Sequence, residues 1–154
     1  MTRIYVLNGA NLNMLGIREP EVYGTVTLDE IRALVTDHAK GLGVEIDFRQ
    51  SNIEGEIINW IHEAHFKADG VILNPGGFTR QSIAIHDAIK AISKPVIELR
   101  LANTARREHY KPGSWMTYAA VGTILGFGKK GYVMALDGVL DVIAQRAITK
   151  QAGS

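Results

Sequence analysis

The sequence predicts an α/β fold in which one parallel sheet is covered by helices on both faces. Short apolar runs typical of buried strands alternate along the whole chain with longer segments whose apolar residues recur at helical spacing. Two helical segments open on a capping-box pattern, at residues 27–30 (TLDE) and 51–54 (SNIE). Because strands separated by helices form right-handed βαβ units, five such strands imply a parallel sheet.

Each expected strand is an apolar run bounded by turn-forming residues. The expected strands are residues 3–7, 44–49, 70–74, 95–99 and 123–127. The first run stops at Asn8 and Gly9, the second alternates between apolar and polar side chains, and the third ends before Pro75.

The expected helices are defined by apolar stripes. These stripes cover residues 28–42, 53–64 and 85–92, and a closing helix is expected to run through roughly Ala147. Thr27 and Thr79 are expected to cap the first and third helices, and Gly43 is expected to close the first.

Length and composition limit the class of protein. The 154-residue chain fits one domain, expected at residues 1–150, followed by a frayed tail at residues 151–154. A formal charge of +1 argues against a nucleic-acid partner. The chain has no cysteine and its histidines lack ligand spacing, so we expect no metal and no cofactor. No apolar run approaches the roughly 20 residues of a membrane span, so we expect a cytoplasmic protein without a membrane partner.

In parallel α/β sheets the ligand lies outside the carboxyl ends of the strands. This rule selects residues 8–23, 74–80 and 98–111 as the segments that carry chemistry. The first segment places Arg18 five residues before Tyr23. A guanidinium favours the phenolate form, so Arg18 is able to lower the pKa of Tyr23 and make it a base. The alternative is an ordinary packing or surface pair.

The other two segments suit anion binding, but each also has a purely structural explanation. Residues 74–77 (NPGG) fit either an anion cradle at a helix start or a tight turn that needs positive φ. Glu98 and Arg100 lie two residues apart at a strand end, so both side chains point to one side of the sheet. They form either part of a site or a simple ion pair, and Arg107 and Lys111 are either ligand-binding cations or a solvated basic face.

Together these loops resemble type II 3-dehydroquinate dehydratase (type II dehydroquinase) along nearly the whole chain. The matching segments are residues 8–12 (NGANL), 18–24 (REPEVYG), 49–52 (RQSN), 60–64 (WIHEA), 74–77 (NPGG), 82–87 (SIAIHD), 98, 103, 107–108 (RE), 126–128 (GFG) and 131–132 (GY). The resemblance implies a flavodoxin-like fold with strand order 2-1-3-4-5. It also implies conversion of 3-dehydroquinate, a small anionic polyol ketone, to 3-dehydroshikimate and water in the shikimate pathway. The implied assembly is a homo-oligomer of trimers packed into a dodecamer.

The resemblance also implies catalytic roles. Tyr23 is implied as the base that removes a proton α to the ketone, Arg18 as its activator, and Asn11 as the holder of a water that stabilises the enolate. Arg100 occupies the position of the histidine that protonates the departing hydroxyl, and Glu98 is expected to pair with it.

The implied substrate-binding residues lie in the same loops. Asn74 is implied to contact the region of the substrate carboxylate, Arg107 belongs to the active-site lid, and Asp87 comes from a neighbouring subunit. The complete implied set is Asn74, Gly76, Gly77, Arg80, Asp87, Leu101, Ala102, Arg107 and Lys111.

Several positions depart from the family pattern. Arg100 and Arg80 replace pocket histidines, Ala102 replaces a serine whose hydroxyl meets the carboxylate, Lys111 replaces a lid arginine, and Ala10 replaces a proline. Arginine stays protonated, with a pKa above about 12, so Arg100 does not deliver a proton near neutral pH. Loss of a general acid typically costs about 10²–10⁴ in rate.

Three hypotheses follow from the sequence. The chain is a 3-dehydroquinate dehydratase in which water replaces the missing acid, or a paralogue that enolises a more anionic ligand such as a dicarboxylate or a phosphorylated polyol. The third hypothesis is a non-enzymatic ligand-binding or assembly protein on the same scaffold.

Overall fold

The computed structural model describes residues 1–17, 21, 24–107 and 113–153. Its five strands form one parallel sheet in the order β2-β1-β3-β4-β5, which confirms the predicted fold class and strand order. The strands are β1 (Arg3–Ala10), β2 (Glu45–Gln50), β3 (Gly70–Gly76), β4 (Val96–Arg100) and β5 (Gly122–Leu125). The strand β5 ends earlier than expected because Gly126 adopts a φ of 95°, which turns the chain out of the sheet.

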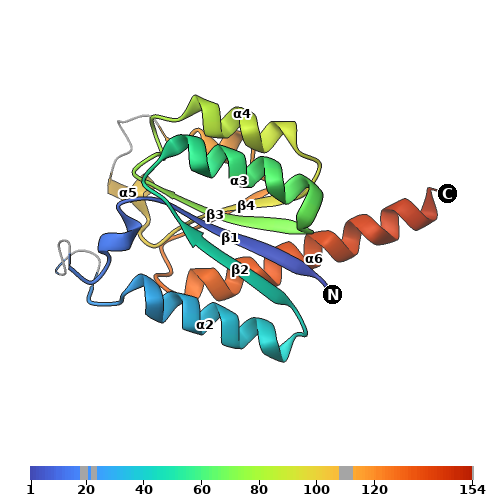
Figure 1. Cartoon of the computed structure of the whole chain (residues 1–154), viewed down its shortest axis with the longest axis horizontal. Helices are drawn as coiled ribbons and strands as arrows, with labels where there is room; N and C mark the ends of the chain where they lie inside the picture. The colour runs from blue at the N-terminus through green and yellow to red at the C-terminus, as the bar shows by residue number, and fades with distance from the viewer. Residues whose placement is uncertain (18–20, 22–23, 108–112, 154) are drawn as a thin grey trace.

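Helices cover both faces of this sheet, as predicted. Figure 1 shows α2 and α6 on one face and α3 and α4 on the other. The helices are α2 (Leu28–Gly41), α3 (Glu54–Lys67), α4 (Ile83–Ala91), α5 (Thr104–Arg107) and α6 (Lys130–Ala152), with short 3-10 helices η1 (Leu12–Met14) and η2 (Met116–Tyr118). The closing helix runs beyond the expected Ala147, and its last turns project past the sheet. Among the described residues, no helix has the length and apolar character of a membrane span.

The expected helix caps are confirmed in one case and wrong in two. Thr27 caps α2, where its hydroxyl accepts from the Glu30 backbone N–H at 3.2 Å. The second capping box does not form, because the Ser51 hydroxyl accepts from the Ile53 N–H and so closes a local turn before the helix begins.

The cap of α4 is Ser82 and not Thr79. The Ser82 hydroxyl accepts from the Ile85 N–H at 2.9 Å. The Thr79 hydroxyl instead donates to the Gly76 carbonyl at 2.6 Å, within the turn that follows β3. Both residues are good capping types, so only the path of the chain between them decides where the helix begins.

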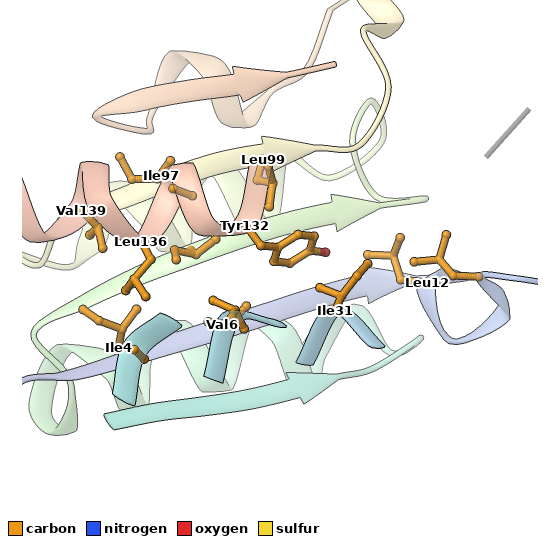
Figure 2. Packing of buried hydrophobic residues seen from close by; sticks show 14 residues of the cluster. Ile4, Val6, Leu12, Ile31, Ile97, Leu99, Tyr132, Leu136 and Val139 are labelled. Atoms are coloured by element: carbon orange, nitrogen blue, oxygen red, sulfur yellow. The ribbon is translucent and has the colours of Figure 1, made fainter. Parts of the chain in front are cut away.

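The core has two parts, one on each face of the sheet. The first packs Ile31 and Val35 of α2 against β1 and against Leu136 and Val139 of α6 (Figure 2). The second packs the buried faces of α3 and α4 against the other side of β1, β3 and β4. Because both faces are covered, the central strands are apolar on both sides, which is typical of parallel sheets.

Tyr132 of α6 connects this core to the carboxyl ends of the strands. Its ring is fully buried, and in Figure 2 its hydroxyl points along the sheet toward Leu12. The hydroxyl donates to Asn8 Oδ1 at 2.7 Å and accepts from Asn74 Nδ2 at 2.9 Å. Burial raises the pKa of Tyr132, so it stays a neutral phenol. One buried phenol therefore joins the ends of two neighbouring strands, since Asn8 and Asn74 are paired in the β1–β3 ladder.

Gly9 is the position where β1 and the turn after β3 approach most closely. A Cβ at Gly9 would lie 2.1 Å from the Pro75 carbonyl oxygen, a distance that no side chain can occupy. We expect Gly9→Ala to lower the free energy of unfolding by about 3 kcal/mol, because backbone must move to relieve the overlap. Urea unfolding measures the change.

Gly55 is the matched control for this substitution. It lies in the exposed first turn of α3, and a Cβ there meets no atom within 4 Å. Alanine has the higher helix propensity, so Gly55→Ala is expected to be neutral or slightly stabilising. Equal unfolding midpoints for the two variants would contradict the close approach at Gly9.

Candidate active site

A cavity of about 310 Å³ opens at the carboxyl ends of β1, β3 and β4, the location that the ligand rule predicts. It is lined by the backbone and side chains of three segments, namely Ala10, Asn11, Leu12, Met14 and Leu15, then Asn74, Gly76, Gly77, Thr79, Arg80 and Gln81, and finally Arg100, Leu101, Ala102 and Thr104. Two arginines line the cavity and none of these lining residues is acidic. The described part of the cavity therefore suits an anion.

The turn after β1 positions Asn11. Its backbone has a φ of 72°, a left-handed conformation that asparagine tolerates better than most residues. The backbone N–H of Asn11 donates to the side-chain oxygen of Asn52 at 2.9 Å. The side chain lies over Gly77, where an added Cβ would stand 3.2 Å from Asn11 Nδ2. This asparagine is therefore held at the edge of the cavity by the segments that follow β2 and β3.

The turn after β3 is built from Asn74, Gly76 and Gly77. The Gly76 N–H donates to Asn74 Oδ1 at 3.2 Å, and the Gly77 N–H donates to the Ala10 carbonyl at 2.9 Å. Gly76 has a φ of 55°, and a Cβ there would lie 2.5 Å from the Ala10 carbonyl oxygen. These glycines therefore make a tight turn, and their N–H groups already have acceptors within the protein. The Asn74 amide is also engaged, since its Nδ2 donates to Tyr132.

Arg100 and Glu98 form the charged end of β4. Arg100 lines the cavity with a side chain that is 12% exposed, and its Nε lies 4.0 Å from Oε2 of the fully buried Glu98. The sequence prediction that both side chains point to one side of the sheet agrees with this geometry. Because its Nε side faces Glu98, the guanidinium is oriented by a buried negative charge as it borders the cavity.

Two threonines hold the Glu98 carboxylate in place. The Thr117 hydroxyl donates to Glu98 Oε1 at 2.6 Å, and the Thr123 hydroxyl donates to the same oxygen at 3.1 Å. Both donors occupy one carboxylate oxygen, so the other oxygen is left facing Arg100. Sequence reasoning missed both threonines, since they follow Glu98 by 19 and 25 residues and carry no motif.

Known proteins are similar to this chain along most of its length. The family model for class II dehydroquinases matches residues 2–140. The chain is 49% identical over 137 residues to the 3-dehydroquinate dehydratase of Maricaulis maris, covering 89% of this chain and 94% of that protein. It is 51% identical over 134 residues to the 3-dehydroquinate dehydratase of Phenylobacterium zucineum, covering 87% and 92% of the two chains.

Solved structures agree. The type II dehydroquinase of Butyrivibrio crossotus superposes with a TM-score of 0.86 at 39% identity, covering 90% of this chain and 97% of that one. A 3-dehydroquinate dehydratase-like protein from Bifidobacterium longum superposes with a TM-score of 0.72 at 31% identity, covering 94% and 99%. The chain belongs to the class II dehydroquinase family.

In this dehydroquinase, most of the expected site residues that the structure describes meet at one cavity. Those that line it are Asn11, Asn74, Gly76, Gly77, Arg80, Arg100, Leu101 and Ala102. Glu98 lies behind Arg100 and is fully buried. Arg80 is fixed through its backbone, because its carbonyl accepts from the Trp115 indole N–H at 3.0 Å.

The other expected residues are not at the described cavity. Asp87 lies on α4 with an exposed side chain that pairs with His86 at 2.9 Å, outside the cavity lining. Arg18, Tyr23 and Lys111 lie outside the described residues, and of Arg107 only the backbone, at the end of α5, is described. Their implied roles stay predictions.

Sequence reasoning missed seven lining residues. They are Ala10, Leu12, Met14, Leu15, Thr79, Gln81 and Thr104. The available signal was their position, because six of the seven lie in the three loops that the ligand rule selects and Gln81 follows directly after the second loop. Within the described ranges, no group of three or more His, Cys, Asp or Glu side chains is placed to hold a metal.

Two described tyrosines are poor candidates for a base. Burial and the hydrogen bond to Glu63 raise the pKa of Tyr5 to about 12, and its hydroxyl faces α3, away from the cavity lining. Burial likewise raises the pKa of Tyr132 above the usual range. Both phenols stay protonated near neutral pH, so neither supplies the phenolate that proton abstraction needs.

Removal of the Thr117 hydroxyl tests the support of Glu98. We expect Thr117→Val to lower the free energy of unfolding by about 2 kcal/mol, because a buried carboxylate loses a charge-assisted hydrogen bond. Thr149→Val is the control, since that hydroxyl donates to a helical carbonyl on the exposed end of α6. Equal urea midpoints for the two variants would show that Thr117 does not support Glu98.

Proposed function

We propose that this chain catalyses the dehydration of 3-dehydroquinate to 3-dehydroshikimate and is therefore a hydro-lyase. The observation that carries the proposal is the cavity itself. Asn11, Asn74 and two arginines converge at the carboxyl ends of three strands, in a chain about half identical to proteins named for this reaction. Fold alone would not support an activity, but the chemistry of these side chains fits a small anionic ketone.

The described lining suits an anionic substrate. Among the described residues, Arg80 and Arg100 line the cavity and the buried Glu98 carboxylate lies behind Arg100. The family resemblance adds Arg18, Arg107 and Lys111 to this site. The choice of 3-dehydroquinate over a dicarboxylate or a phosphorylated polyol therefore rests on the relatives that are named for this reaction.

The reaction begins with proton abstraction. We assign Tyr23, activated by Arg18, as the phenolate that takes the proton from the carbon α to the ketone, and the electron pair of that C–H bond forms the enolate. A water held by Asn11 donates a hydrogen bond to the enolate oxygen. Such donors stabilise charge as it develops in the transition state, and this stabilisation is usually the largest single contribution to catalysis.

The second half of the reaction proceeds without a side-chain acid at position 100. The enolate collapses, the C–O bond breaks, and the departing oxygen takes a proton from a water molecule in the cavity. The hydroxide so formed is stabilised by the fixed positive charge of Arg100. The proton held by Tyr23 then passes to this hydroxide through solvent, so that one water is released for each substrate and the enzyme returns to its starting state.

The direct test is a turnover assay. Formation of the conjugated enone of 3-dehydroshikimate is followed by absorbance in real time, with folded protein and with buffer alone. We expect slow but protein-dependent turnover, because a general acid contributes about 10²–10⁴ to the rate and this chain has none at position 100. A rate indistinguishable from buffer, from correctly folded protein, would reject the proposal.

We also propose that the chain forms trimers that pack into a dodecamer, as its family resemblance implies. Apolar side chains are exposed beside Asp87: Ile83 of α4, Tyr118 of η2 and the adjacent Trp115. The Trp115 ring lies 6.3 Å from His86 and 6.5 Å from Tyr118, so these side chains form one surface. Covering it would bury apolar area and bring Asp87 to a neighbouring subunit. Light scattering is expected to give the mass of a dodecamer of the 16.9 kDa chain, and a monomer mass would contradict it.

A further inference from the structure

Two buried side-chain oxygens lack a hydrogen-bond partner in the part of the chain that the structure describes, one in β4 and one at the start of α5. They are Glu98 Oε2 and Thr104 Oγ1. Buried polar atoms are nearly always hydrogen-bonded, so each exception calls for a physical explanation. Glu98 Oε2 has the Arg100 charge 4.0 Å away. Within the described ranges, the Thr104 hydroxyl has no such compensation.

Thr104 lies on the cavity, two residues after Ala102. Both residues line it, and the Thr104 N–H donates to the Ala102 carbonyl at 3.0 Å, which folds the segment so that the two positions are neighbours. Ala102 offers only a methyl group. Among the lining residues that follow β4, Thr104 is therefore the one that carries a hydroxyl.

Thr79, the other threonine of the lining, is a useful contrast. Its hydroxyl donates to the Gly76 carbonyl at 2.6 Å, so it has a structural partner and serves the turn after β3. Thr104 begins the short helix α5, where a threonine side chain can occupy either of two staggered positions. A change between these positions moves the hydroxyl by a bond rotation alone, without movement of the backbone.

We propose that the Thr104 hydroxyl is a substrate-binding group, which donates a hydrogen bond to the substrate carboxylate and supplies the hydroxyl that Ala102 lacks. This assignment rests on the proposed dehydratase function. The carboxylate is the strongest acceptor on 3-dehydroquinate, so an unpartnered hydroxyl gains most by donating to it. Substrate binding then satisfies a hydroxyl for which the described residues provide no partner.

The isosteric variant Thr104→Val separates this role from a structural one. We expect KM for 3-dehydroquinate to rise about tenfold while kcat changes less than twofold, because the lost contact is made equally in the ground state and the transition state. The melting temperature is expected to stay level or rise, since valine removes a buried hydroxyl that has no partner. If Thr104 had a structural role instead, Thr104→Val would lower the melting temperature.

Three further variants complete the test. Thr104→Ser is expected to keep the wild-type KM, and Ala102→Ser added to Thr104→Val is expected to restore most of the lost affinity. Thr149→Val, on the exposed end of α6, is the control that changes neither KM nor stability. A KM for Thr104→Val within twofold of wild type would overturn the proposal, and so would a double variant no better than the single one.

Wild-type turnover tests the dehydratase function, and the effect of Thr104→Val tests the role of Thr104. Absence of wild-type turnover rejects the dehydratase, and the dissociation constant for 3-dehydroquinate from calorimetry then takes the place of KM in every comparison. A wild-type protein that turns substrate over but shows no effect of Thr104→Val rejects the role of Thr104 alone. A wild-type protein that neither converts nor binds 3-dehydroquinate rejects both.

Discussion

Replacement of Arg100 by histidine is expected to raise kcat for 3-dehydroquinate by about 10²- to 10⁴-fold, which is the usual contribution of a general acid. Position 100 lies at the end of β4 on the wall of the cavity, so an imidazole there borders the substrate. Arginine holds its proton too tightly to release it near neutral pH, whereas an imidazolium releases it readily.

The surroundings of position 100 already suit a histidine. Glu98 Oε2 lies 4.0 Å from the present Arg100 Nε, and Thr117 and Thr123 hold the other carboxylate oxygen. One imidazole N–H is able to donate to Glu98, which leaves the second ring nitrogen to face the departing hydroxyl. The buried carboxylate also raises the pKa of the imidazole, because it favours the charged form.

The pH dependence of Arg100→His checks this mechanism. The acid must be protonated, so kcat is expected to be level below the imidazole pKa and to fall as pH rises through it. The wild type is expected to lack this falling limb, since Arg100 does not titrate in that range. Arg100→Gln is the control, because glutamine is polar but carries no transferable proton. A kcat for Arg100→His no higher than that of Arg100→Gln would show that the acid step does not limit turnover.

Tyr23→Phe is expected to lower kcat by about 10²–10⁴, because it removes the phenol that we propose as the base for the α-proton. The described tyrosines Tyr5 and Tyr132 do not replace it, since burial raises the pKa of both. Two measurements are informative: turnover of 3-dehydroquinate, and exchange of its α-proton with deuterium oxide. Both are expected to be lost together.

Tyr5→Phe is the matched control for this substitution. Tyr5 also loses a phenol hydroxyl, but its hydroxyl donates to Glu63 of α3 and not toward the cavity. Turnover within a few-fold of wild type is expected for it. The double variant Arg100→His with Tyr23→Phe is expected to show no gain over Tyr23→Phe, because an acid has nothing to protonate when the enolate does not form. Deuterium exchange that persists in Tyr23→Phe would exclude Tyr23 as the base.

The cap residues show where local sequence is sufficient and where it is not. Thr27 caps α2 as predicted, because the helix start follows directly from a hydroxyl and the apolar stripe behind it. Thr79 and Ser82 both precede α4, and the choice between them depends on the turn after β3. That turn engages Thr79 with Gly76 and leaves Ser82 to cap the helix. The presence of two hydroxyl residues before the helix does not by itself show which of them the turn after β3 engages.

The site shows the same division. The ligand rule selected the three loops from the expected carboxyl ends of the strands, and residues of all three loops line one cavity. The family resemblance then named Asn11, Arg80 and Arg100 as site residues. Local sequence does not show that the Tyr132 hydroxyl holds Asn8 and Asn74 in place, since Tyr132 follows them by 124 and 58 residues.

The charged end of β4 was determined partly by the sequence and partly by the tertiary structure. By itself the sequence determined that an arginine stands where the family resemblance implies a histidine, and that Glu98 and Arg100 share one side of a strand, because side chains in a strand alternate. Only the tertiary structure decided what surrounds that pair. Thr117 and Thr123 come from segments that the sheet brings together, and they occupy one oxygen of Glu98 and leave the other to Arg100. The sequence determines which side chains a protein has, but side chains far apart along the chain come into contact only when the chain folds.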